Sequence, residues 1–176
     1  MNVFIDTEFT CLPWNIGSQL ISIGVYFEDG EEYYACSAEF DLSSASEFVL
    51  NNVVPQLPEI NQRKTEATIG TELKEAISAR NIANVWAVFP TIEQLKNMYV
   101  GTLSIRELHS KYADWDFKLM NSLIHSLPAN YPKKCNDLSP LIQELGKSTL
   151  PKNNSAHNAL EDAKWNYKVW QKWKNA

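Results

Sequence analysis

The chain has 176 residues, of which 44% are hydrophobic and 21% charged, so it is long enough to bury the core of one domain and too apolar for a disordered tail. The net charge of −5 argues against a protein that coats nucleic acid through bulk positive charge, but it leaves open an acidic enzyme that holds nucleic acid through metal ions. No apolar stretch reaches the roughly 18 residues that cross a bilayer, and the N-terminus has no secretory signal. The three cysteines show no zinc spacing, so we expect a cytoplasmic protein with reduced thiols and no membrane partner.

The first forty residues predict three strands. Apolar and β-branched residues indicate strands over 3–9, 20–27 and 31–40. The pair Asp29-Gly30 between the second and third runs is typical of a hairpin turn.

From residue 46 onward the pattern becomes mainly helical. Apolar residues recur at helical spacing over 46–54 and 68–80, and a buried strand is expected over 84–89. Thr91 to Gln94 has the form of a capping box, and Ser139 before Pro140 has the form of an N-cap with proline in the first turn, in a helix that Gly146 would end. Later helices are expected over 115–126, 140–145 and 159–173. This order predicts a single α/β domain over residues 1–176.

Two acidic residues, Asp6 and Glu8, lie in the otherwise apolar first strand. Residues two apart on a strand share a face, so both carboxylates can converge on one point. Buried carboxylates must be paired or bind metal, which favours a metal site. The alternative is a pair of acids at an exposed strand end.

A second polar segment, Ser155 to Ala163, precedes the last predicted helix. If Asn158 is the N-cap and Glu161 its capping-box partner, the helix begins at Ala159. His157 then lies on the entering loop and Asp162 in the helix, which lets the two side chains meet. An ordinary loop histidine and a solvated acid near the helix start are the alternatives.

Together these segments resemble the DEDDh 3′–5′ exonucleases of the ribonuclease H-like superfamily, in particular the small bacterial and phage exoribonuclease-like group. The resemblance lies in Asp6 to Phe9, Leu20 to Val25, Glu32 to Ala35, Glu39 to Asp41 and the late H-N-A-L-E-D-A segment. It implies an α/β ribonuclease H-like fold, with a mixed central sheet flanked by helices. It also implies a metal-dependent 3′–5′ exonuclease that releases nucleoside 5′-monophosphates.

The family also has an aspartate in the middle of the chain, and here the sequence offers three candidates. Asp116 opens an amphipathic helix and is our choice. It follows the Trp86-Ala87 strand by about thirty residues, a longer distance than the family usually shows, which an insertion over 91–111 would explain. Glu93 and Asp114 are the rivals.

The resemblance implies two Mg²⁺ or Mn²⁺ ions, which prefer carboxylate oxygens. Asp6 would bridge both ions, Glu8 and Asp162 would hold one of them, and Asp116 would support the other. His157 would be the general base. The resemblance also places a nucleotide pocket around Thr7, Phe9, Thr10 and Ser22, although Phe9 fits the core equally well.

RNA, or another nucleic acid with a single-stranded or overhanging 3′ end, is the expected partner, and a homodimer is plausible by resemblance. The alternatives are a 3′–5′ DNA exonuclease and a nucleic-acid-binding module that does not cut. The tryptophans and lysines over 162–176 could bind nucleic acid. We favour the simpler interpretation, in which Ala163, Tyr167 and Trp170 pack on the sheet and the lysines face solvent.

Overall fold

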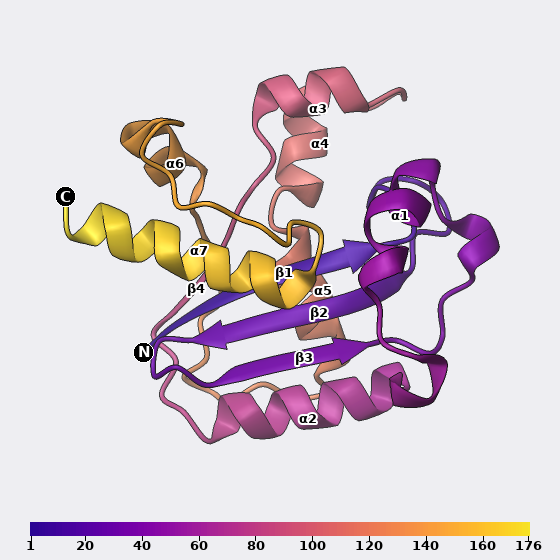
Figure 1. Cartoon of the computed structure of the whole chain (residues 1–176), viewed down its shortest axis with the longest axis horizontal. Helices are drawn as coiled ribbons and strands as arrows, with labels where there is room; N and C mark the ends of the chain where they lie inside the picture. Colours follow the sequence, from indigo (N-terminus) through magenta and orange to yellow (C-terminus); the bar gives the residue numbers. More distant parts are fainter.

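The computed structural model describes residues 1–176 and is built around a five-stranded sheet with the order β3-β2-β1-β4-β5 (Figure 1). The strands are β1 (Asn2–Phe9), β2 (Leu20–Phe27), β3 (Glu32–Cys36), β4 (Asn84–Ala87) and β5 (Cys135–Asp137). β1 pairs antiparallel with β2 and parallel with β4, so the sheet is mixed, as the sequence predicts.

The expected strands are present, with different ends. The third is shorter than the predicted 31–40, because Ser37 leaves the ladder and forms an isolated bridge with Lys64. The fourth ends at Ala87 rather than at residue 89. Strand β5 was not predicted, because its three residues, Cys-Asn-Asp, carry no β-branched or aromatic signal.

Seven α-helices and three short 3₁₀ helices complete the chain. The α-helices are α1 (Glu47–Asn52), α2 (Glu66–Ser78), α3 (Ile92–Met98), α4 (Ile105–Tyr112), α5 (Trp115–Leu123), α6 (Ser139–Leu145) and α7 (Ala159–Lys174). The 3₁₀ helices are η1 (Leu42–Ser44), η2 (Val54–Gln56) and η3 (Ile60–Gln62). No helix has both the length and the apolar character that a membrane span needs.

The helix starts largely follow the local signals. Thr91 and Gln94 form the expected capping box of α3, and Gly146 ends α6 with a φ of 74°. The N-cap expected at Ser139 is wrong: Leu138 is the cap, because the Ser139 hydroxyl donates to the carbonyl of Phe89 at 2.6 Å. Helix α4 was not predicted, although Ser104 and Glu107 form its capping box.

Helices cover both faces of the sheet (Figure 1). On one face, α2 and α5 pack against a buried apolar cluster that includes Ile5, Ile23 and Leu73. On the other face, α7 crosses β1 and β2, with Phe4 and Trp170 buried between them. Helices α3 and α4 form the insertion expected after the fourth strand, and they stand above the end of β1.

The start of α7 approaches β2 very closely. A Cβ atom on Gly24 would lie 2.2 Å from the backbone carbonyl of Ala159, so only glycine fits there. One turn after Asp162, the buried Asn166 donates its side-chain amide to the carbonyl of Ile5 at 3.1 Å. These two contacts fix α7 against the strand that carries Asp6 and Glu8.

Candidate functional site

The two acidic residues of β1 face the side of the sheet that α7 covers. Phe4 packs its ring against Tyr167 and Trp170 of α7, with ring centroids 5.3 and 5.6 Å apart. Since side chains alternate along a strand, Asp6 and Glu8 share the face of Phe4. The two carboxylates therefore share one face of the sheet, as predicted, and it is the face that α7 covers.

Asp162 lies in the first turns of α7, and both its oxygens are hydrogen-bonded. The backbone N–H of His157 donates to Oδ2 at 2.8 Å, and the side-chain amide of Asn153 donates to Oδ1. Asn158 is the N-cap, as predicted, and accepts from the N–H groups of Leu160 and Glu161. The expected capping-box role of the Glu161 side chain is wrong, because that carboxylate pairs with Lys164 at 3.1 Å.

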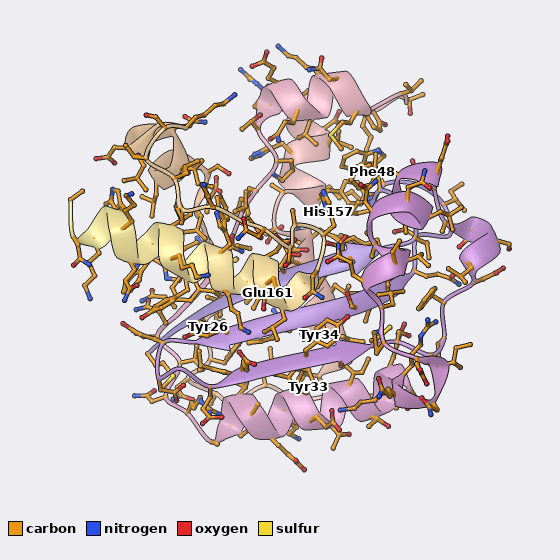
Figure 2. All side chains as sticks on the ribbon, viewed as in Figure 1. Tyr26, Tyr33, Tyr34, Phe48, His157 and Glu161 are labelled. Atoms are coloured by element: carbon orange, nitrogen blue, oxygen red, sulfur yellow. The ribbon has the colours of Figure 1, made fainter.

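His157 has an unusual backbone conformation just before the helix. Its φ is 70°, the only positive value outside glycine, and histidine adopts this region more readily than most residues. Its ring lies edge-on to Phe48 of α1, with centroids 4.9 Å apart. Figure 2 labels the two side chains, which lie near each other. Strained backbone of this kind is concentrated at functional sites.

Glu8, His157 and Asp162 come together, although they lie at opposite ends of the chain. Each offers one ligand atom, and these atoms lie within 4.8 Å of one another. A carboxylate, an imidazole and a second carboxylate form a donor set suited to a divalent cation. The structure therefore contains a group of side chains that could hold a metal ion.

The mid-chain aspartate Asp116 belongs to the same acidic region. It lies in α5 and accepts a hydrogen bond from the hydroxyl of Thr7. Its charge is the largest electrostatic cause that raises the pKa of Asp6. Asp114 instead pairs with Lys118 at 2.6 Å, and Glu93 is exposed on α3.

Burial raises the pKa of all four carboxylates, and for Asp6 and Glu8 the neighbouring acids raise it further. Burial and then the charges of Asp116, Glu8 and Asp162 raise the pKa of Asp6 well above its usual range. Burial and then Asp162 and Asp116 raise the pKa of Glu8 to about 8.

The other two carboxylates are affected less. Burial raises the pKa of Asp116 to about 6, against the opposing effect of the Thr7 hydrogen bond. Burial also raises the pKa of Asp162, partly offset by the N–H of His157 and the amide of Asn153. Buried carboxylates with raised pKa values are expected at a cation site without its cation, because a bound cation would stabilise their charged forms.

The residues expected to line a nucleotide pocket occupy different layers. Phe9 lines a cleft beside Glu8, whereas Thr7 points to the opposite face and holds Asp116. Thr10 is fully buried, and its hydroxyl accepts from the N–H of Gln19 at 3.1 Å. Ser22 is 1% exposed and pairs with Glu8 across the strands. A role for these four residues in substrate binding stays a prediction.

The cleft beside Glu8 has a volume of about 460 Å³ and a mostly apolar lining. Its walls come from the end of β1, the loop that follows, α1 and the end of α3. The lining residues are Glu8, Phe9, Cys11, Leu12, Pro13, Asn15, Ser46, Phe48, Val49 and Met98. Most of these residues were not predicted, since no local sequence pattern indicates which side chains meet only after folding.

The sequence is similar to curated proteins that are named 3′–5′ exoribonucleases. It is 30% identical over 169 residues to a Mycobacterium tuberculosis (strain CDC 1551 / Oshkosh) protein named 3′–5′ exoribonuclease MT2234.1, covering 93% of this chain and 88% of the relative. The same figures hold for the protein of strain H37Rv named 3′–5′ exoribonuclease Rv2179c. No protein-family model matches the sequence.

Solved structures share the fold at much lower identity. The crystal structure of cell-death related nuclease 4 (CRN-4) gives a TM-score of 0.54 at 12% identity, over 99% of this chain and 63% of that one. A structure described as 3′-end specific recognition of histone mRNA stem-loop by 3′-exonuclease gives 0.52 at 10%, over 99% and 81%. These likenesses confirm the predicted fold class.

Proposed function

Because the chain belongs to the family of these 3′–5′ exoribonucleases, we propose that it removes nucleotides from the 3′ end of RNA and that it does so with a DEDDh site of the ribonuclease H-like type. The observation that carries the proposal is the meeting of Glu8, His157 and Asp162 at the end of the strand that also bears Asp6. Asp116 completes the acidic set, with Thr7 holding its carboxylate.

The acidic residues fit the two Mg²⁺ or Mn²⁺ ions of this proposal. Asp6, Glu8, Asp116 and Asp162 would hold them, and the raised pKa values of all four support a site designed for added positive charge. When bound, the ions would supply charge neutralisation at the scissile phosphate and a more acidic water.

His157 is proposed as the general base. It would take the proton of the attacking water, whose oxygen forms the new bond to phosphorus while the bond to the 3′ oxygen of the preceding nucleotide breaks. The products are a nucleoside 5′-monophosphate and a chain one nucleotide shorter. The hydrogen bond from the His157 N–H to Asp162 and the edge of Phe48 hold the imidazole beside the carboxylates.

The apolar cleft beside Glu8 supports binding of the terminal nucleotide, with Phe9 as one wall. An aromatic side chain stacks on any nucleobase.

We also propose that the protein is cytoplasmic and forms a homodimer. Sedimentation of the purified protein tests the homodimer.

The experiment that tests the proposal is digestion of matched 5′-labelled RNA and DNA oligonucleotides in Mg²⁺, Mn²⁺ or EDTA. We expect ladders that shorten from the 3′ end, faster with RNA, and no products with EDTA or with Asp6→Ala. His157→Ala should lower the rate by 10²–10⁴-fold, the usual contribution of a general base, while Mn²⁺ still binds. Exposed Glu93→Gln is the control for a lost acid.

Two outcomes would contradict the proposal. If wild-type protein leaves every oligonucleotide intact in both metals, the chain is a binding module on this fold. If DNA is cut faster than RNA, the substrate class is wrong although the chemistry stands.

A further inference from the structure

Five aromatic side chains form a continuous row that leads away from the cleft. In order they are Phe9, Trp115, Tyr112, Trp14 and Tyr99, with centroids of successive rings 6.4, 5.4, 6.1 and 6.2 Å apart. These distances lie in the range of direct ring contacts. We call this set the aromatic row.

The aromatic row joins the cleft to the insertion. Phe9 lines the cleft, and so does Met98, the residue that precedes Tyr99 at the end of α3. The row therefore begins where the proposed terminal nucleotide lies and continues over the loop after β1 and over α4. Figure 1 shows α3 and α4 standing above this end of the sheet.

The rings are not core residues of the usual kind. Phe4 and Phe27, which belong to the cores of the sheet, are 0% and 1% exposed, whereas every residue of the aromatic row is only half-buried. Partly exposed neighbouring rings offer faces or edges to a ligand that stacks. Nucleobases have this chemistry, because every base has a π-face.

Positive charge accompanies the aromatic row in a protein whose net charge is −5. The Nζ atom of Lys111 lies 5.2 Å from the centroid of the Tyr112 ring. Lys96, Arg106 and Lys111 of α3 and α4 form no ion pair, unlike Lys118, which pairs with Asp114. Half-buried rings with an unpaired lysine beside one of them suit a single-stranded nucleic acid, whose backbone is negative.

We infer that the aromatic row is an extended binding surface for the RNA nucleotides that precede the terminal one. The inference rests on the proposed function, because the row starts at the proposed catalytic cleft. It assigns the insertion a role: α3 and α4 guide the single strand toward the cleft and favour substrates long enough to reach Trp14 and Tyr112.

The test compares RNA binding and hydrolysis as a function of length. Binding of a labelled single-stranded RNA of about twelve nucleotides is measured in EDTA, so that this readout is independent of activity. We expect Trp14→Leu and Tyr112→Leu to weaken it at least about fivefold, the lower end for loss of one base–aromatic stack, and Tyr112→Phe to retain it. The ratio of kcat/KM for this RNA to that for a dinucleotide should fall by a similar factor.

Two lysine variants test the contribution of positive charge to RNA binding. Lys111→Ala should reduce the slope of log Kd against log salt by about 0.7, the contribution of one contact to a single strand. Lys168→Ala removes another exposed lysine, from α7, and should leave the slope unchanged.

Three results would overturn the inference. If the leucine variants lowered kcat/KM by the same factor for the long RNA and for the dinucleotide, their effect would be purely structural. Unchanged binding of the long RNA would exclude the row as its path. If Ile16→Ser or Val100→Ser, at the fully exposed tips beside Trp14 and Tyr99, changed the sedimenting mass while RNA binding stayed intact, the surface would be a protein interface. Failure of wild-type hydrolysis with the expected binding pattern would contradict the proposed function alone.

Discussion

Glu8 is the residue in which stability and proposed function conflict most directly. Its carboxylate lies within reach of His157 and Asp162, and burial and the neighbouring acids raise its pKa to about 8. Near neutral pH the folded protein must therefore either keep a proton there or bear an unfavourable charge. A bound cation would remove this penalty.

Glu8→Gln tests the conflict. We expect the metal-free variant to unfold at a higher temperature than wild type at pH 8, by roughly 2–4 °C for each kcal/mol gained, because one charge leaves the cluster. Affinity for Mn²⁺ should fall at the same time, since a carboxylate ligand is lost. Thermal melts in EDTA and calorimetric Mn²⁺ titrations measure both. Glu93→Gln should change neither, and a lower melting temperature for Glu8→Gln would contradict the argument.

At the scale of elements, α7 is the helix on which the site depends. It supplies Asp162, positions His157 through a backbone hydrogen bond, and is fixed to the sheet by Gly24 and Asn166. A small displacement of its first turn would separate ligand atoms that now lie within 4.8 Å.

Gly24→Ala should produce such a displacement. The new methyl group would overlap the backbone of Ala159, and overpacking of this kind costs about 1–3 kcal/mol. Gly30→Ala is the control, because its φ of 94° disfavours alanine and its turn follows β2, at the opposite end of that strand from Ser22, the partner of Glu8. Both variants should melt earlier, but only Gly24→Ala should lose Mn²⁺ affinity; equal affinities in the two would show that α7 tolerates the shift.

The elements predicted correctly are those with local signals. The alternation of β1 indicated the shared face of Asp6 and Glu8, and Asn158 marked the start of α7. The polar triplet of β5 gave no such signal, because its strand character comes from pairing with β4. Met98 and Asn153 also escaped prediction, since each reaches the site from a separate loop or helix end through tertiary packing alone.

For the whole molecule, the acidic cluster predicts an unusual dependence of stability on pH. A carboxylate whose pKa is raised in the folded state binds its proton more tightly there than in the unfolded chain. Its stabilising effect is complete below the unfolded pKa and is lost as pH rises through the folded value. With Asp116 at about 6 and Glu8 at about 8, the pKa values predict that the metal-free protein loses stability between about pH 4 and 8.

Divalent metal should reverse this loss. At a free concentration of one hundred times Kd, Mg²⁺ or Mn²⁺ stabilises by about 2.7 kcal/mol, or roughly 5–10 °C in Tm. The shift should be larger at pH 8 than at pH 6, because protons compete with the metal for the same carboxylates. Melts across this pH range, with and without EDTA, measure it. A shift that is absent at millimolar metal, or larger at pH 6, would contradict the site.

The site joins β1 to α7, which lie far apart along the chain, and this has a consequence for biosynthesis. A ribosome that has made the sheet has still not made Asp162 or the helix that positions His157. Until the residues of α7 emerge from the exit tunnel, the growing polypeptide has no complete acidic cluster. With the proposed site, the growing chain would gain its nuclease activity only after α7 has been made, and so could not attack its own messenger during most of its synthesis.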